Sequence, residues 1–177
     1  MKLTIIVLVV CGLAAGCTKK IKYCGQEIRE DTRVIYCMGK EFDLKTGLKG
    51  LERFKRLQYL YLDRAPVVDV APLAKLSELR LLYLQWTRVH DIRPLAGLRK
   101  LESLSIAHTN VTDISALRSL KTITMLKIGG LRLRDASPIY ALPLLRELQI
   151  AHATVPASQV TALENYLKAK KITIIPF

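Results

Sequence analysis

The sequence predicts an α/β solenoid, in which short turns of similar structure stack along one axis. The first observation is a set of aliphatic columns that recur every 22 residues: Leu51, Leu73, Leu95, Leu117 and Ile139; and Leu60, Leu82, Leu104, Leu126 and Leu148. The second is an aspartate with the same spacing, at Asp69, Asp91, Asp113 and Asp135. One turn of this length cannot bury its apolar side chains alone. A fixed period of this kind therefore indicates turns that stack on one another.

Each turn begins with a segment that is typical of a short strand. From Leu79 to Leu84 the aliphatic residues follow the pattern Leu-x-x-Leu-x-Leu, whose final alternation favours a strand with one buried face. The next segment, from Val89 to Leu95, predicts a short helical turn. Asp91 is placed to accept hydrogen bonds from the first backbone N–H groups of that turn. Prolines are tolerated at its start, where an N–H group is not needed, and they occur at Pro72, Pro94 and Pro138.

The repeat Leu-x-x-Leu-x-Leu-x-x-Thr-x-Val-x-Asp-Ile-x-Pro-Leu resembles the leucine-rich repeats of bacterial internalin-like proteins. The resemblance implies a curved solenoid with a parallel β-sheet on the concave face and short helices or 3-10 turns on the convex face. It also implies a role in binding proteins through the concave face. One loop position departs from the family, because its usual asparagine is replaced by Ala65, Thr87, Thr109, Leu131 and Ala153. We therefore expect weaker side-chain bonding between neighbouring loops.

Both ends of the stack need caps, because the outermost turns would otherwise expose their apolar faces. Residues 24–50 are expected to form an N-terminal cap, and the leucine-rich repeats are expected over residues 51–155. Residues 156–177 are expected to form a C-terminal cap. Within it, Ser158 to Lys170 predicts a helix and Ile172 to Ile175 a last strand. The apolar residues at helical spacing in this cap are Val160, Leu163, Tyr166 and Leu167.

The first residues are typical of an export signal. Lys2 is followed by an uncharged run from Leu3 to Ala15 that ends in small residues. Cys17 directly follows Ala-Ala-Gly, which resembles the lipobox of bacterial lipoproteins. The resemblance implies that residues 1–16 are removed as a signal peptide and that Cys17 carries the lipid. Residues 17–23 are then expected to act as a tether to the membrane.

A lipid anchor would place the chain in the bacterial cell envelope. Thr18 follows the cysteine in place of the aspartate that is associated with retention in the inner membrane, which favours the outer membrane, on its periplasmic or surface side. Cleavage to a soluble exported protein and an unprocessed cytosolic chain are the alternatives.

Export also bears on Cys24 and Cys37, because disulfides persist outside the cytosol. The two cysteines are located on either side of Val34-Ile35-Tyr36, which has the composition of a strand. We expect them to form a disulfide that fastens the N-terminal end of the stack. Two separately buried thiols are the alternative.

The net charge of +13 favours acidic partners, such as anionic lipid headgroups, lipopolysaccharide phosphates, acidic proteins or nucleic acid. An envelope location argues against nucleic acid. The basic residues are also scattered between the apolar repeat positions, so a solvated outer surface is the simpler interpretation.

Aromatic residues gather at the N-terminal end of the expected concave face. Successive strands lie about 4.8 Å apart, so these aromatic side chains would be neighbours. Tyr and Trp are enriched in protein-binding hot spots, which favours a binding surface here. The predicted protein-binding residues are Tyr36, Tyr59, Tyr61, Leu81, Tyr83, Gln85, Trp86, His108, Glu147, Gln149 and His152. An aromatic ladder that only stabilises the sheet is the alternative.

The sequence predicts no catalytic, metal or cofactor site. His108 and His152 share a repeat position two turns apart, but no third ligand accompanies them. Ser103 and Ser105 lie near His108 in the repeat, without a nucleophile elbow or an oxyanion loop. We therefore expect no enzymatic activity and no small-molecule substrate.

These observations predict a non-enzymatic, lipid-anchored envelope protein whose concave face binds a protein partner, with an acidic partner favoured by the charge. One alternative is a structural lipoprotein that associates with an anionic envelope polymer such as lipopolysaccharide. The other is an inhibitor or immunity-type binder that uses the same surface.

Overall fold

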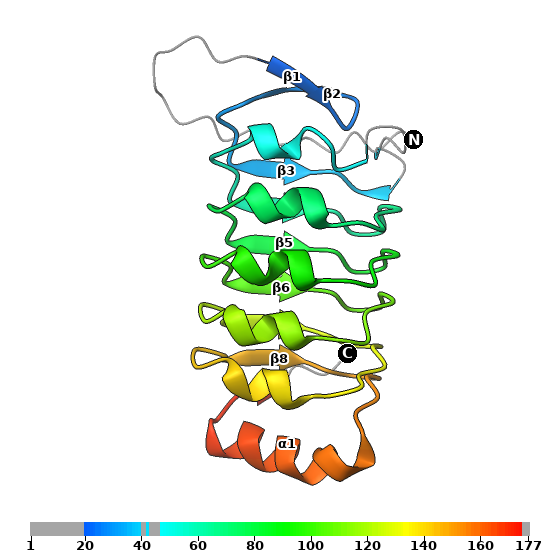
Figure 1. Ribbon diagram of the computed structural model, residues 1–177, viewed down its shortest axis with the longest axis vertical. Coiled ribbons are helices and arrows are strands. Elements are labelled where there is room, and N and C mark those ends of the chain that lie inside the picture. Colours follow the sequence, from blue (N-terminus) through cyan, green and yellow to red (C-terminus); the bar gives the residue numbers. More distant parts are fainter. Residues whose placement is uncertain (1–19, 40–41, 43–46, 175–177) are drawn as a thin grey trace, which may run out of the picture.

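The computed structural model describes residues 20–39, 42 and 47–174, and these form one elongated stack of turns (Figure 1). The strands make a seven-stranded parallel sheet in the order β3 to β9. They are β3 (Val34–Tyr36), β4 (Tyr59–Tyr61), β5 (Leu81–Tyr83), β6 (Ser103–Ser105), β7 (Met125–Lys127), β8 (Glu147–Gln149) and β9 (Thr173–Ile174). A column of 3-10 helices runs alongside the sheet and consists of η2 (Leu51–Arg53), η3 (Ala71–Lys75), η4 (Arg93–Gly97), η5 (Ser115–Ser119) and η6 (Ser137–Ala141). This architecture confirms the predicted α/β solenoid.

The core consists of aliphatic columns that run the length of the stack. The central residue of each strand points inward and is the register partner of the central residue in the next strand. From β4 to β8 these residues have no exposed surface, and they are Leu60, Leu82, Leu104, Leu126 and Leu148. The 3-10 helices contribute a second column that is equally buried, formed by Leu51, Leu73, Leu95, Leu117 and Ile139. Burying one such side chain stabilises the fold by about 1.5–3 kcal/mol before chain entropy is subtracted.

The repeated aspartates bind the backbone at the start of the 3-10 helices, as predicted. The Asp91 carboxylate accepts a hydrogen bond of 2.9 Å from the N–H group of Arg93. Asp69, Asp113 and Asp135 accept equivalent bonds of 2.8 Å. The aspartate lies one residue before the N-cap position, which Ile92 occupies in η4. Hydrogen bonds from the Arg93 side chain and backbone lower the pKa of Asp91 to about 2.

Neighbouring loops are joined by their backbones. At the loop position where the family has asparagine, the hydroxyl groups of Thr87 and Thr109 donate to carbonyl groups within their own turns, each at 2.7 Å. Between turns, the N–H group of Arg88 donates to the carbonyl of Val67 at 2.9 Å. The two threonines therefore close individual loops, while main-chain bonds connect one loop to the next.

The N-terminal cap is a β-hairpin, with β1 (Lys20–Tyr23) antiparallel to β2 (Gln26–Arg29). Cys24 and Gly25 both have positive φ, at 49° and 72°, which fits a two-residue hairpin turn. Residues 20–23, which we expected to be the end of the tether (residues 17–23), instead form the first strand of this hairpin. Tyr23 holds strand β1 against the core, because its side chain is buried and its ring centroid lies 6.2 Å from that of Phe54.

Cys24 and Cys37 form the predicted disulfide, with their Cα atoms 5.9 Å apart. The bond joins the hairpin turn to the residue that follows β3. Ile35 of β3 pairs with Leu60 of β4, and both Ile35 and Cys37 point into the core, as expected. The disulfide therefore fastens the cap to the first strand of the sheet.

The C-terminal cap consists of α1 (Ala157–Ala169) and β9, in agreement with the predicted helix and strand. Leu163 and Leu167 are buried against the last turn. Val160 differs from the prediction, because 40% of its surface is exposed. It lies near the start of α1, where it borders an open hollow rather than the interior of the last turn.

The predicted signal peptide (residues 1–16) and Cys17 lie outside the described residues. Within the described part of the chain, no helix has the length and apolar character that crossing a membrane requires.

The disulfide yields a test of the N-terminal cap. Replacing Cys24→Ser together with Cys37→Ser is expected to lower the free energy of unfolding by about 2–4 kcal/mol, because the cross-link no longer constrains the unfolded chain. Chemical denaturation measures this change. A reductant should destabilise the parent protein and leave the double variant unaffected. An equal response of both proteins to the reductant would contradict the structural role of the bond.

Candidate protein-binding face

The side of the sheet that faces away from the core carries the predicted binding residues. We call this side the sheet face, and it is formed by the first and third residues of strands β3 to β8. At its N-terminal end the sheet face is aromatic, with Tyr36, Tyr59, Tyr61, Leu81 and Tyr83 all partly exposed. Parallel register places Tyr59 beside Leu81, and Tyr61 between Tyr36 and Tyr83.

Three tyrosines form a continuous ladder across β3, β4 and β5. The rings of Tyr36 and Tyr61 are stacked, with centroids 4.4 Å apart and planes 13° apart. Tyr61 meets Tyr83 edge to face at 5.4 Å. Burial raises the pKa of Tyr61 to about 12, so its phenol is neutral at physiological pH. We refer to these three residues as the tyrosine ladder.

The tyrosine ladder ends at Tyr83 of β5, whose side chain also contacts two residues of β7. The Lys127 ammonium group lies 5.1 Å from the centroid of the Tyr83 ring, which is within the range of a cation–π contact. The Tyr83 hydroxyl group approaches the Met125 sulfur at 3.8 Å. Contacts on both sides therefore hold the Tyr83 ring in one orientation.

The C-terminal half of the sheet face offers less side-chain surface. Ser105 is fully buried and its hydroxyl group donates to Gln85 at 3.4 Å. Gln149 is only 5% exposed, so this predicted binding residue presents almost nothing to a partner. Glu147 is partly exposed and accessible from solvent. The accessible aromatic surface is therefore confined to the N-terminal half.

A second feature runs along the edge of the sheet, where each strand has just ended. One residue per turn there has a positive φ, between 54° and 73°, and these residues are Arg64, Trp86, His108, Gly130 and His152. We call them the edge column. Only one of the five is glycine, although a left-handed conformation costs other residues about 1–2 kcal/mol each. Such strain makes these side chains candidates for a functional role.

Trp86 and His108 of the edge column form a flat stack. Their ring centroids are 3.9 Å apart and their planes differ by 8°. Gly130 provides the space for this stack, because a Cβ atom at residue 130 would lie 2.5 Å from Nδ1 of His108. Trp86 is 55% exposed. His152 is exposed as well, and the sequence did not reveal the stacked arrangement of Trp86 and His108.

The sequence analysis did not single out Asp63, which links two neighbouring turns at the edge of the sheet. Its carboxylate accepts a hydrogen bond of 3.2 Å from the N–H group of Gln85, one turn later. Burial raises the pKa of Asp63. Asp63 and Gln85 are 22 residues apart, so the repeat spacing was the signal that could have identified the pair.

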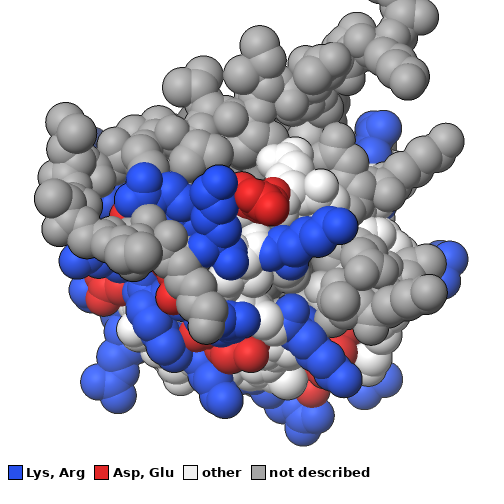
Figure 2. All heavy atoms as spheres, turned by 90° about the horizontal axis from the view of Figure 1, so that it is seen from above, with Lys and Arg blue, Asp and Glu red and all other residues white. Residues whose placement is uncertain are grey.

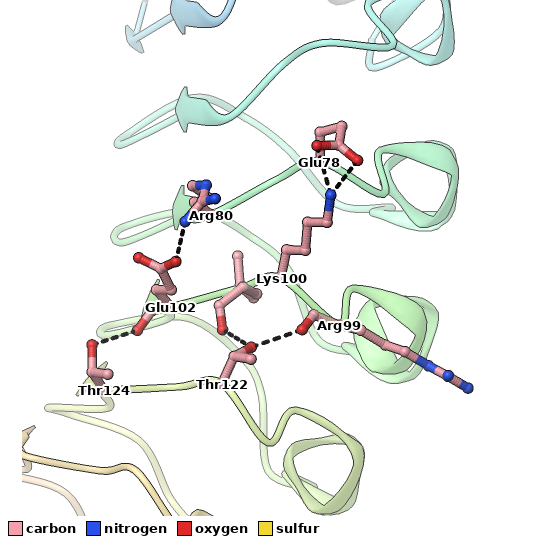
Figure 3. A network of polar contacts seen from close by, with 8 residues as sticks. Glu78, Arg80, Arg99, Lys100, Glu102, Thr122 and Thr124 are labelled. Atoms are coloured by element: carbon pink, nitrogen blue, oxygen red, sulfur yellow. Dashed lines mark hydrogen bonds and ion pairs between the residues drawn. The ribbon is translucent and has the colours of Figure 1, made fainter.

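A polar ladder joins consecutive turns on the opposite edge of the sheet (Figure 3). Lys100 contacts both carboxylate oxygens of Glu78, at 2.6 and 2.8 Å. Arg80 forms an ion pair with Glu102. We call these four residues the flank ladder. Each pair is solvent-exposed and contributes about 0–1 kcal/mol, so the ladder adjusts the charge pattern more than it stabilises the fold.

Basic residues are distributed around the molecule. Figure 2 looks onto the end that carries β1 and β2, and Lys and Arg side chains are scattered over the described surface in this view, with Asp and Glu between them. Among the described residues, no group of three or more His, Cys, Asp or Glu side chains could hold a metal ion. The charge in this view is spread over the surface and does not form one basic patch.

The stack of Trp86 and His108 yields a test of the edge column. Gly130→Ala is expected to lower the free energy of unfolding by about 1–2 kcal/mol, because alanine is strained at this positive φ. The free energy of unfolding should fall further because the added methyl group displaces the His108 ring. Thermal or chemical denaturation measures the change, and Trp86, the single tryptophan, reports the displacement by fluorescence.

The control combines Gly130→Ala with His108→Ala, and is compared with His108→Ala alone. Here the clash is absent, so Gly130→Ala should cost only the backbone contribution. If Gly130→Ala costs the same with and without the His108 ring, then Gly130 does not hold the stack.

Comparison with models of known protein families and with curated protein sequences gave no match. Among solved structures, the chain is similar to an internalin, inlF, of Listeria monocytogenes, with a TM-score of 0.64 and 21% identity over 86% of this chain and 50% of that one. Internalin C2 of the same species gives 0.53 and 19% over 86% of both chains. A leucine-rich repeat protein of Leptospira interrogans gives 0.54 and 16% over 71% of this chain and 38% of that one. The chain thus spans about half the length of inlF, and it has the leucine-rich repeat fold that the repeat pattern predicts.

Proposed function

We propose that this chain is a non-enzymatic protein-binding module. The observation that supports this most strongly is the tyrosine ladder, together with the exposed ring of Trp86, which lies on the same end of the sheet. Tyr and Trp supply large rigid contact areas with a polar atom at one end, and they are enriched among residues that dominate binding energy. The partner docks on these side chains and on Tyr59, Leu81 and His108.

Preorganisation supports a binding role. The ladder rings contact one another, and Tyr83 is held further by Lys127 and Met125. A partner would not need to order these side chains, which usually costs about 0.5–1.5 kcal/mol for each immobilised side chain. The Trp86 ring is likewise oriented by His108 while 55% of its surface stays accessible.

We also propose that the protein is lipid-anchored in the bacterial cell envelope through Cys17, after removal of residues 1–16. The sequence before Cys17 supports this location. So does the Cys24–Cys37 disulfide, because such bonds persist in oxidising compartments. The full chain has a net charge of +13, and removal of Lys2 with residues 1–16 leaves +12. An envelope protein with this charge would attract acidic partners at separations up to about the Debye length.

The binding proposal is tested with Tyr61→Ala combined with Trp86→Ala. The double variant should lose its partner in affinity capture from envelope extracts, because both the middle of the ladder and the exposed indole ring are removed. Its free energy of unfolding should fall by about 2–4 kcal/mol, the loss expected for the three aromatic contacts that these two rings make. The protein therefore stays folded while binding is lost.

The matched control is Val68→Ala combined with Leu144→Ala. These residues are 46% and 52% exposed and lie away from the sheet face, so the control removes exposed apolar side chains without altering the proposed site. Equal capture by both double variants would exclude the aromatic end as the docking site. Capture that disappears at high salt in the parent protein would instead favour an anionic polymer such as lipopolysaccharide.

The anchoring proposal predicts that the mature protein begins at Cys17 with a lipid on its sulfur. Mass spectrometry of the protein purified from membranes should show this modified N-terminus. Cys17→Ser should move the protein from the membrane to the soluble fraction, whereas Cys11→Ser should have no such effect. An unmodified N-terminus in membrane-derived protein would refute the lipid anchor.

A further inference from the structure

The flank ladder follows a simple charge rule. On this edge, two positions per turn lie just before each strand, and the turns that lead into β5 and β6 have opposite charges at both positions. Glu78 is followed one turn later by Lys100, and Arg80 by Glu102. Each of these neighbours forms an ion pair, as Figure 3 shows. Each basic group of these two turns is therefore matched by a carboxylate in the adjacent turn, whereas the following turn has the uncharged Thr122 and Thr124 at the same positions.

This pairing does not extend to the turns on the N-terminal side of the ladder. Arg56 occupies the position of Glu78 in the preceding turn, but both Glu78 oxygens contact Lys100. Arg33 occupies the position that precedes β3, and its neighbour one turn later is the uncharged Gln58. Within the described residues, neither Arg33 nor Arg56 forms an ion pair.

The two arginines border a common hollow. A depression of about 290 Å³ is lined by Arg33, Arg56, Gln58 and Glu78. The two guanidinium groups and the Gln58 amide provide only hydrogen-bond donors and one amide oxygen. Its single carboxylate, Glu78, is already bound to Lys100. The hollow therefore combines two basic groups without the acidic group that the rest of the ladder supplies.

We propose that this hollow binds a carboxylate, which the partner protein supplies from an aspartate or glutamate side chain. The proposal deepens the binding function above and rests on it. The carboxylate takes the place in the ladder that Glu78 and Glu102 take in later turns. Arginine suits this role because its planar guanidinium group can donate two parallel hydrogen bonds to one carboxylate.

The hollow is continuous with the proposed docking surface. Arg33 directly precedes β3 and Gln58 directly precedes β4, and the N–H group of Gln58 donates to the carbonyl of Arg33 at 2.8 Å. The same two strands carry Tyr36, Tyr59 and Tyr61. A partner segment that covers the aromatic end of the sheet face thus reaches the hollow within a few residues. The charged contact fixes its register, while the aromatic contacts supply most of the affinity.

The site is tested without the partner by NMR titration of the ¹⁵N-labelled protein with glutarate, at constant ionic strength. The amide signals of residues around Arg33 and Gln58 should shift and saturate in the millimolar range. Arg33→Gln combined with Arg56→Gln should weaken glutarate binding about tenfold, because two charge-assisted contacts are lost. Arg33→Lys combined with Arg56→Lys should give an intermediate loss, since charge is kept and paired hydrogen bonding is not.

The matched control is Lys75→Gln combined with Arg99→Gln, which removes the same charge from two exposed residues outside the hollow. This control should change glutarate affinity less than twofold. If both double variants weaken binding equally, the effect is general electrostatics and the site is refuted. If inorganic phosphate shifts the same signals and glutarate does not, the hollow is a phosphate site, and the partner carboxylate is refuted as well.

A further experiment distinguishes the carboxylate site from the aromatic docking site. Tyr61→Ala with Trp86→Ala should leave the glutarate titration unchanged, because neither residue lines the hollow. Loss of partner capture in that variant with intact glutarate binding supports both proposals. Normal partner capture with intact glutarate binding would refute the aromatic docking site and leave the carboxylate site standing.

Discussion

The stacking of each turn on the next is the interaction on which the whole structure depends. A strand of three residues has no stability of its own, and its backbone groups find partners only in the adjacent turns. Leu84, for example, donates its N–H group to Ser105 of the next turn, and Glu102 donates to Arg80 of the previous one. The same contacts align the inward leucines into columns without exposed surface. Each turn thus gains both its hydrogen bonds and its apolar contacts from its neighbours. The outermost turns have a neighbour on one side only, which is why the hairpin with its disulfide and helix α1 are integral to the fold.

Regular stacking also explains the form of the candidate site. Because every turn leaves its strand in the same way, each has a residue with positive φ at the same place, and this position becomes the edge column. Glycine is the residue that adopts this conformation at least cost. The chain instead has arginine, tryptophan and histidine at four of the five positions, and glycine where the His108 ring needs space. The fold thereby accepts local strain at the edge of the surface that we propose binds a partner.

In our proposal, the sheet face and the edge that precedes the strands contribute different contacts to recognition. The tyrosine ladder and Trp86 provide rigid apolar area, and the hollow between Arg33 and Arg56 provides a directional charge contact. Both lie at the N-terminal end, close to the disulfide that fastens β3 to the cap. The C-terminal half of the sheet face, with Ser105 and Gln149 buried, offers less to a partner. Recognition is therefore expected at the end of the solenoid that is braced covalently.

The repeat spacing by itself determined the stack, the parallel register of the leucine columns and the aspartate contacts, and the helical spacing of apolar residues near the C-terminus determined the cap helix. Each of these follows from periodic burial and local backbone chemistry. It also placed the tyrosines on one face, since alternation along a strand decides which side chains point outward. Only the tertiary structure decided the hairpin at residues 20–29, the stacking of Trp86 on His108 over Gly130, the burial of Gln149 and the unmatched pair Arg33 and Arg56. Those features depend on side-chain orientations across neighbouring turns and on packing at an irregular end. Neither is encoded in a period of 22 residues, because a period specifies which positions are equivalent and not which contacts their particular side chains make.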